Sequence, residues 1–280
     1  MKRFRFWNAG FGRGEFHMAV DRVLLRRVEA GESEPMIRVY GWKPWCVTLG
    51  HMQDPSRELD FAKLVEREWT WCKRPTGGRA VLHAHELTYS LVASHASAPW
   101  CSRRDTSFEK IGLALNALLH DMGLSTALAR GENTPGRAKN GPALPCFAST
   151  SRQEVTWQGH KLVGSAQRRS RLAFLQHGSM PLDSSFLRLI EAMPLDEKAE
   201  LLFQRELQNH AVDLSRALGR PLAYDAVAGL AFDAFARQLE VEIHPAGLTA
   251  EELEEIDAEM QRNPWGSAEV SDDPAKARMA

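Results

Sequence analysis

Apolar residues recur at helical spacing in several parts of the chain. They predict helices over Met18 to Val28, Asp60 to Glu68 and Phe108 to Met122. Gly31 and Gly123 follow the first and the third of these segments as stop signals.

From about residue 185 the pattern becomes helical almost to the end of the chain. One apolar stripe consists of Val227, Leu230, Ala231, Ala234 and Phe235. Farther on, Thr249 and Glu252 form a capping box that predicts the start of a last helix. Residues 264–280 are rich in polar residues and proline, and we expect a frayed tail there.

Short apolar runs bounded by glycine and proline predict strands at Met36 to Tyr40, Cys46 to Leu49, Trp69 to Lys73, Leu87 to Val92 and Ala173 to Gln176. The first two runs are close in sequence and predict a hairpin or strand pair. A second, tight hairpin is predicted where Gln158, Gly159 and His160 separate two β-prone runs. Together the pattern predicts an α+β fold with a central mixed, largely antiparallel sheet flanked by helices, as one domain over residues 1–263.

Composition narrows the function classes. The chain has 280 residues with a formal net charge of −1, so no global field attracts nucleic acid or an anionic membrane. It contains no apolar run near the ~20 residues that span a bilayer. The first 16 residues lack the continuous apolar segment of a signal peptide, which favours a cytoplasmic protein.

The four cysteines lie far apart and form no CxxC pair, which argues against a zinc ribbon and a redox dithiol. Cys46 and Cys72 fall inside apolar strands, where cysteine usually acts as a small buried hydrophobe. Cys146 differs, because it follows the glycine- and proline-rich residues 131–143, which predict an exposed, mobile loop. A nearby cation would make Cys146 a nucleophile, and a buried structural role is the alternative.

A glycine-rich block joins two predicted strands. Paired glycines let backbone amides approach a ligand, and flanking arginines supply positive charge for a carbonyl or an anion. The candidate binding residues here are Arg74, Thr76, Gly77, Gly78, Arg79, Ala80 and His83. The alternative interpretation is a glycine hairpin with solvated arginines.

A strand lysine followed by small residues forms a second candidate site. Lys161 can point its ammonium into a pocket whose floor is the backbone of Gly164, Ser165 and Ala166, and there bind an acyl carbonyl. The alternative is an exposed strand lysine.

The histidines and the basic runs give weaker indications of function than the two candidate sites. His83, His85 and His177 lack the spacing of a metal site, and we expect neither a metal nor another cofactor. The basic runs Arg103–Arg104 and 168–171 are typical of solvated faces and matter only for an acidic partner.

Taken together, these blocks resemble the lipoate-protein ligase and octanoyltransferase superfamily, which shares its catalytic fold with biotin-protein ligases. The resemblance covers most of the chain and is carried, in order, by the helix with Met18 and Asp21, by residues 38–42 and 48–53, by 74–83 and 86–90, and by 159–167 and 176–179. One departure is Ala84, which follows His83 where the family often has Asp.

Within the superfamily, the resemblance implies a branch. ATP-dependent ligases typically carry an asparagine-aspartate pair before the lysine strand, whereas this chain has Cys146 there, similar to the cysteine-dependent octanoyltransferases. Such an enzyme would transfer octanoyl from octanoyl-acyl carrier protein to a lysine of a lipoyl domain, on the glycine cleavage H protein or a 2-oxoacid dehydrogenase E2. The resemblance implies Cys146 and Lys161 as catalytic residues and an acyl-cysteine intermediate.

Three alternatives stay open at this point. A lipoate-protein ligase would use ATP and leave Cys146 incidental. A lipoyl-domain amidotransferase would use the same cysteine with a different donor. A binding module without catalysis would need neither residue, although the presence of both Cys146 and Lys161 argues against it.

Overall fold

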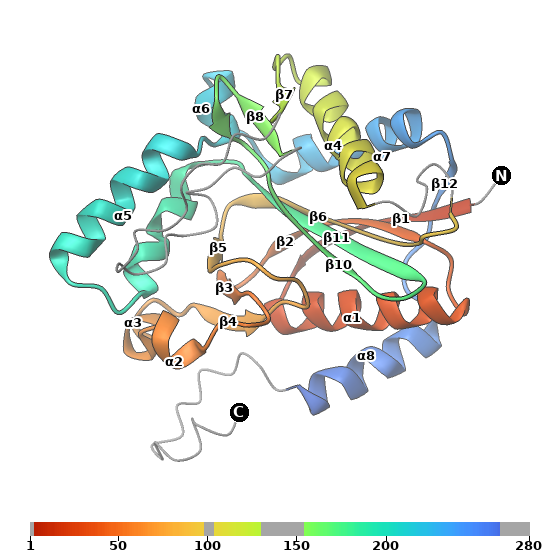
Figure 1. Cartoon of the computed structure of the whole chain (residues 1–280), viewed down its shortest axis with the longest axis horizontal. Helices are drawn as coiled ribbons and strands as arrows, with labels where there is room; N and C mark the ends of the chain where they lie inside the picture. Colours follow the sequence, from red (N-terminus) through yellow and green to blue (C-terminus); the bar gives the residue numbers. More distant parts are fainter. Residues whose placement is uncertain (1–2, 98–103, 130–153, 264–280) are drawn as a thin grey trace.

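A six-stranded mixed sheet forms the centre of the molecule (Figure 1). We describe it from a computed structural model that defines residues 3–97, 104–129 and 154–263. The strand order is β10-β11-β6-β2-β1-β12. The pairings from β10 to β2 are antiparallel, whereas β1 pairs in parallel with both β2 and β12. The predicted fold class, with a mixed, largely antiparallel sheet, is confirmed.

The strands of this sheet are β1 (Arg3–Gly12), β2 (Met36–Trp42), β6 (Glu86–Ser94), β10 (Gly164–Arg169), β11 (Ala173–Pro181) and β12 (Glu242–Pro245). The sequence prediction missed β1, β10 and β12. In β1 the signal was present, because Arg3 and Arg5 alternate with the buried Phe4 and Phe6.

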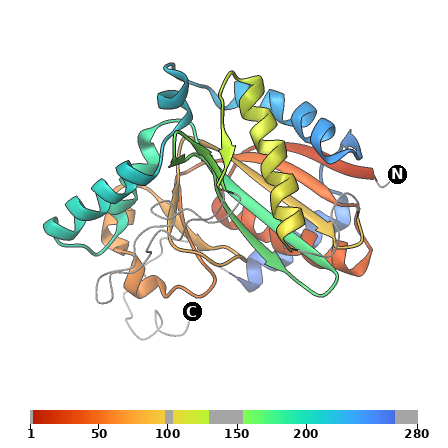
Figure 2. The same ribbon diagram turned by 45° about the horizontal axis from the view of Figure 1, so that its top comes forward.

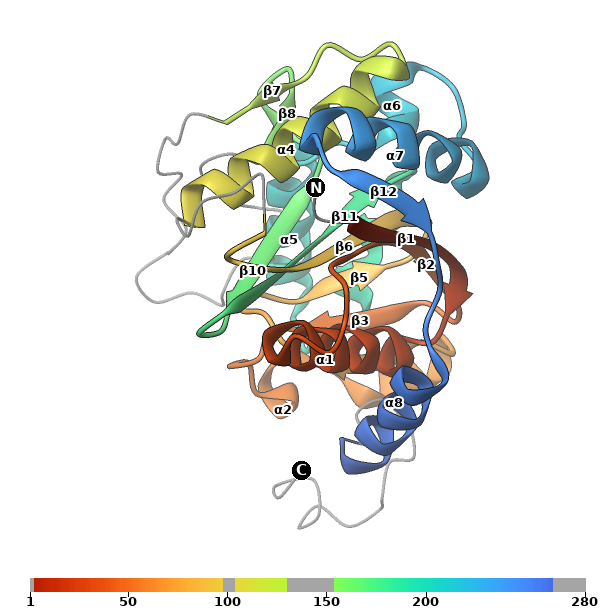
Figure 3. The same ribbon diagram turned by 90° about the vertical axis from the view of Figure 1, so that its right-hand side faces the viewer.

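Helices cover both faces of the sheet. Figures 1 and 3 show α4 (Arg104–Asp121) and α7 (Tyr224–Leu239) on one face, with α1 (Gly14–Ala30) and α8 (Ala250–Arg262) on the other. Successive strand residues point to opposite faces, so Ile37 packs in the core under α4 and α7 while its neighbour Met36 packs against α1. The predicted helices in these regions are confirmed, and so is the capping box at Thr249 and Glu252.

A second sheet of three strands lies beside the large one. It contains β3 (Cys46–Leu49), β4 (Thr70–Lys73) and β5 (Val81–His83), in the order β4-β3-β5. The short helices α2 (Pro55–Glu58) and α3 (Phe61–Glu66) connect β3 to β4. The predicted pairing of β2 with β3 was therefore wrong: the chain between them crosses from one sheet to the other, and β3 pairs with β4 and β5 instead.

A small third sheet contains β7 (Ala127–Leu128), β8 (Val155–Trp157) and β9 (His160–Lys161). The predicted hairpin is confirmed, because Trp157 pairs with His160 across a turn in which Gln158 and Gly159 have φ of 49° and 83°. Glycine adopts this left-handed conformation without strain. The hairpin places Lys161 opposite Thr156.

The C-terminal part is largely helical, as predicted. It contains the 3₁₀ helix η2 (Ser184–Ala192), α5 (Glu197–His210) and α6 (Leu214–Leu218) before α7 and α8, with β12 as the exception. Figure 2 shows α5 projecting from the side of the molecule that carries the second sheet. Among the described residues, no helix has the length and hydrophobicity needed to cross a membrane.

Candidate active site

A pocket lies where the large sheet and the second sheet meet α1. It is partly open to solvent, and the space between its walls, counted together with that open part, is about 450 Å³. Four aromatic or aliphatic side chains and several buried polar ones line it: Met18, Tyr40, Trp42, Val81, Thr48, Arg74, His83, Thr88, His177 and Ser179, together with Gly164, Ser165, Ala166 and Gly178.

The main wall of the pocket is the face of β2, β6 and β11 that is turned toward α1. At one end this face is apolar, with Met36, Val92 and Leu175 packed against α1. Because side chains on one face recur every second residue, the next positions in register are Arg38, Ser90 and His177. The face therefore changes from apolar to polar where the pocket begins.

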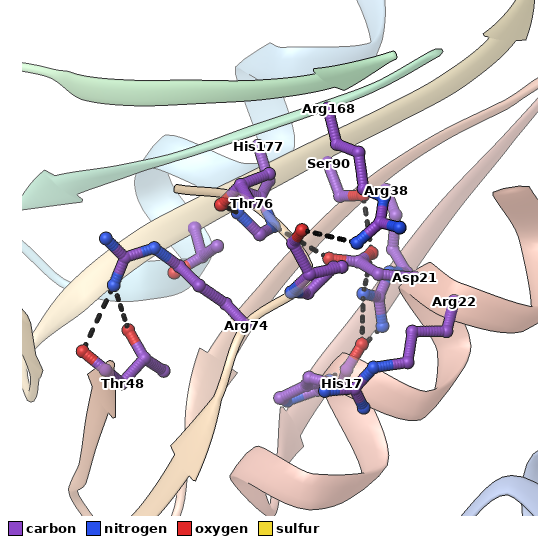
Figure 4. A network of polar contacts seen from close by, with 12 residues as sticks. His17, Asp21, Arg22, Arg38, Thr48, Arg74, Thr76, Ser90, Arg168 and His177 are labelled. Atoms are coloured by element: carbon purple, nitrogen blue, oxygen red, sulfur yellow. Dashed lines mark hydrogen bonds and ion pairs between the residues drawn. The ribbon is translucent and has the colours of Figure 1, made fainter. Parts of the chain in front are cut away.

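Asp21 on α1 binds all three of these polar side chains (Figure 4). Its Oδ1 accepts hydrogen bonds from Arg38 Nη2 at 2.8 Å and Ser90 Oγ at 2.7 Å. Its Oδ2 lies 2.8 Å from Nδ1 of His177. On the other side of that ring, Nε2 is 2.7 Å from the hydroxyl of Thr76 in the glycine-rich block. This chain of contacts fixes the block to the large sheet.

The charges in this network are well defined. Burial alone would raise the pKa of Asp21, but the Arg38 guanidinium and the hydrogen bond from His177 lower it to about 2. Burial lowers the pKa of His177, although the contact with Asp21 opposes that shift. Burial, followed by the charge of Arg38, lowers the pKa of His17 to about 3. Asp21 is thus ionised at neutral pH, and neutral His177 donates from Nδ1 to Asp21 and accepts from Thr76 at Nε2.

A second chain of the same type runs through His83. Its Nδ1 lies 2.8 Å from Glu86 Oε1, its Nε2 lies 2.7 Å from the hydroxyl of Thr48, and its ring stacks on Trp42. Glu86 also accepts hydrogen bonds from the Trp42 indole, from Thr88 and from Ser179. Both histidines that line the pocket are therefore held between a buried carboxylate and a threonine.

Arginines hold the glycine-rich block by its carbonyl groups. Arg74 donates to the carbonyls of Gly77 and Arg79, and also to the carbonyl and hydroxyl of Thr48. Arg22 donates to the carbonyl of Lys73 and Arg168 to that of Pro75. Arg74 lines the pocket, but its guanidinium binds the loop carbonyls and so stabilises the conformation of the loop. Direct substrate binding by Arg74 stays a prediction.

The paired glycines lie exposed beside the pocket. Gly78 has a φ of 100°, and a Cβ added to Gly50 would come within 2.0 Å of the Gly78 carbonyl oxygen. The local structure thus needs glycine at positions 50 and 78. Of the other predicted binding residues in this block, Thr76 reaches the pocket through His177, whereas Ala80 is buried in the core of the second sheet.

Lys161 is the last residue of β9 in the third sheet, and its side chain is buried rather than exposed. Its Nζ lies 2.7 Å from Glu154 Oε1, and each side chain is only 2% exposed. Lys161 does not line the pocket, but the segment Gly164 to Ala166, which begins three residues later, does. Cys146 and the predicted loop 131–143 lie outside the described residues, as does the predicted tail.

Several residues of this site were not assigned a role from the sequence. Glu86, Thr48 and Glu154 were given no role, and their contacts form only when separate strands come together: Thr48 on β3 with His83 on β5, His83 with Glu86 on β6, and Glu154 beside β8 with Lys161 on β9. Alternation of polar with apolar residues along Glu86 to Ser90 was the one available signal. Within the described ranges, His, Cys, Asp and Glu form no group of three that could hold a metal ion. Cys46 and Cys72 are buried, as predicted.

Comparisons with known proteins agree on one family. The family model described as "Lipoyl protein ligase A/B catalytic domain" matches residues 13–236. The chain is 36% identical over 257 residues to an octanoyltransferase LipM of Kyrpidia tusciae, covering 91% of this chain and 93% of that protein. It is 30% identical over 254 residues to the octanoyltransferase LipM of Bacillus subtilis, covering 90% and 91% of the two chains.

Solved structures show the same fold at lower identity. A bipartite lipoate protein ligase of Thermoplasma acidophilum superposes with a TM-score of 0.74 at 19% identity, covering 94% of this chain and 93% of that one. A lipoate-protein ligase A bound with ATP gives a TM-score of 0.72 at 18% identity, covering 94% and 95%. Because the family model spans residues 13–236 and the relatives cover about nine-tenths of the chain, this chain belongs to the lipoyl protein ligase A/B catalytic domain family.

Proposed function

We propose that this protein is an acyltransferase that moves an octanoyl group to a specific lysine of lipoyl domains in protein lipoylation. The observation that carries the proposal is its similarity, over about nine-tenths of its length, to several proteins named octanoyltransferase, at 30 to 36% identity. The proposed donor is octanoyl-acyl carrier protein, and the proposed acceptors are the H protein of glycine cleavage and 2-oxoacid dehydrogenase E2 subunits. We place this reaction in the cytoplasm, where we expect these partners.

The reaction needs two acyl transfers and no ATP. In the first, the Cys146 thiolate attacks the thioester carbonyl, a new C–S bond forms, and the carrier leaves as a thiol after taking up a proton. In the second, the neutral ε-amine of the acceptor lysine attacks the acyl-cysteine, loses a proton as the amide forms, and releases Cys146. Lys161 stabilises the oxyanion that develops at the carbonyl in both steps.

The geometry supports a division of labour around the pocket. The acyl chain fits between Met18, Tyr40, Trp42 and Val81, because the polar side chains beside them are already paired with one another. Each buried methylene contributes about 0.8 kcal/mol, so a chain of seven carbons beyond the carbonyl binds well before entropic costs. We place Gly77, Gly78 and Arg79 at the reacting end, together with Gly164 to Ala166 of the pocket wall, and the arginine contacts to the loop carbonyls support a fixed loop conformation.

A transfer assay tests the proposal. The protein is incubated with octanoyl-acyl carrier protein and apo lipoyl domain without ATP, and octanoylation of the acceptor lysine is followed by mass spectrometry. We expect ATP-independent transfer that Cys146→Ala abolishes. Modification of the lipoyl domain that requires lipoate, ATP and magnesium and survives Cys146→Ala would instead identify a ligase.

A further inference from the structure

Lys161 and Glu154 form a buried ion pair near the pocket. The two charged atoms are 2.7 Å apart, and both side chains are almost completely shielded from water. Removing two charges from water is unfavourable, and their attraction offsets this only when the geometry is good. Because buried ion pairs in general add little net stability, a role in positioning is the natural hypothesis for this one.

Backbone contacts hold both residues of the pair. The Glu154 carbonyl accepts from the amide of Ala129, and the Lys161 carbonyl accepts from the amide of Val212. The residues that follow each of them are also joined, because the amide of Leu162 donates to the Val155 carbonyl beside the β8–β9 hairpin. The backbones that carry the carboxylate and the ammonium are thus fixed on two sides, and the Lys161 ammonium points toward Glu154.

Tyr89 connects the pair to the pocket. Burial raises the pKa of Tyr89 to about 12, and the negative charge of Glu154 adds to this effect, which places the carboxylate within electrostatic reach of the phenol. The Tyr89 hydroxyl is 2.7 Å from Oγ of Ser165, a residue of the pocket wall. Lys161 also precedes Gly164, the first residue of this wall, by only three residues along the chain, so the ion pair lies close to the wall.

We infer that Glu154 is a positioning residue that holds Lys161 as an oriented ammonium for acyl transfer, an inference that rests on the function proposed above. An ammonium has three N–H donors, so a bond to Glu154 is compatible with a second bond to the acyl carbonyl oxygen. The carboxylate lies against the ammonium in its buried surroundings and offsets the cost of burying that charge. It also limits the positions that the side chain can adopt, which lowers the cost of bringing the ammonium to the oxyanion.

Other titratable groups surround the pair and contribute to any pH profile. They are Tyr89 on β6, His160 beside Lys161 on β9, His210 at the end of α5, and Asp213 after the residue that binds the Lys161 carbonyl. All four are present in a Glu154 variant as well, so the difference between the pH profiles of variant and native protein reports the effect of the carboxylate alone.

The experiment measures the rate of acyl-enzyme formation against pH, with octanoyl-acyl carrier protein and rapid-quench intact mass. We expect Glu154→Gln to lower the rate by about tenfold to a hundredfold. We also expect the alkaline limb of the profile to move to lower pH, because an ammonium that has lost its carboxylate gives up its proton more easily. Glu154→Asp, which keeps the charge but withdraws it by one methylene, should lower the rate and leave the alkaline limb in place.

Glu252→Gln is the matched control. Glu252 is also buried and forms an ion pair with Arg5, at 2.6 Å, but it lies on α8, on the opposite side of the sheet from β8 (Figures 1 and 3). It should lower stability and leave the rate per folded molecule and the pH profile unchanged. A native rate and profile in Glu154→Gln would overturn the inference; if that variant does not fold, a native rate in Glu154→Asp would do so. Native protein that forms no acyl-enzyme would overturn the proposed function and this inference with it.

Discussion

Among single residues, His17 and Asp21 show how the site depends on buried polar groups. His17 Nε2 donates to the Gly41 carbonyl, and Nδ1 accepts from Arg38, which in turn binds Asp21. The pKa of His17 falls from an ordinary 6.5 to about 3 on folding, so between these values the unfolded chain binds a proton that the native state does not. Stability is therefore full above pH 6.5 and decreases as the pH falls toward 3. Asp21, with its pKa lowered to about 2, adds a loss of the same sign below about pH 4.

Replacing His17 should make stability less sensitive to pH. Between pH 6.5 and 5 the native protein should lose about 2 kcal/mol of unfolding free energy through His17, and His17→Gln should remove that part of the slope while lowering stability at pH 7. Urea unfolding at several pH values measures both. The exposed His120 on α4 is the control, since His120→Gln should leave the slope intact. Equal slopes in native protein and His17→Gln would contradict this account.

For single residues too, the sequence predicted which segments form the pocket but not which side chains are hydrogen-bonded to each other. Arg74 and His83 were predicted from the glycine-rich block, and both line the pocket. That Arg74 would bind the carbonyls of its own loop, and His83 the carboxylate of Glu86, followed from no motif. Both sets of contacts are short-range in sequence, but they depend on the conformation that the loop and the turn after β5 adopt, which the residue pattern alone does not determine.

At the scale of elements, β10 and β11 approach each other so closely at Gly178 that a larger residue does not fit there. A Cβ on Gly178 would lie 2.6 Å from both the Gly164 carbonyl oxygen and a ring carbon of Tyr89. We expect Gly178→Ala to lower the unfolding free energy by about 1–3 kcal/mol and to reduce transfer activity, because the strands must separate at the pocket wall. Gly229→Ala on the exposed face of α7, where nothing lies within 4 Å, should raise stability by about 0.5–1 kcal/mol. Chemical denaturation compares the two, and a neutral Gly178→Ala would count against the close approach.

Helical periodicity predicted elements better than strand patterns did. α1, α4, α7 and α8 were predicted because each buries one apolar stripe over several turns. β12 carries only four residues, of which none is fully buried, so it has almost no pattern. The crossing from β2 to β3 looked like a hairpin because the two strands are only three residues apart, and chain proximity does not fix which strands pair.

At the scale of the whole molecule, the N-terminal strands and the C-terminal helices share one core. Phe4, Ile37 and Phe235 belong to the same buried cluster, which supports the prediction of a single domain. We therefore expect one cooperative thermal transition, and Phe235→Ala should lower the stability of the entire protein by about 3–5 kcal/mol. Calorimetry together with hydrogen exchange measures this. Leu201→Ala, at a side chain on α5 that is 58% exposed, should have little effect. Separate melting of α7 would contradict a single domain.

The nucleophile at Cys146 is the central claim, and intact-mass analysis after mixing with octanoyl-acyl carrier protein tests it most directly. Native protein should gain the mass of one octanoyl group, which the later addition of apo lipoyl domain removes. Cys146→Ala should gain nothing, whereas Cys101→Ala and the buried-cysteine variant Cys46→Ala should be acylated like the native protein. An adduct that persists in Cys146→Ala, or native protein that gains no mass while it still octanoylates the lipoyl domain, would contradict the account.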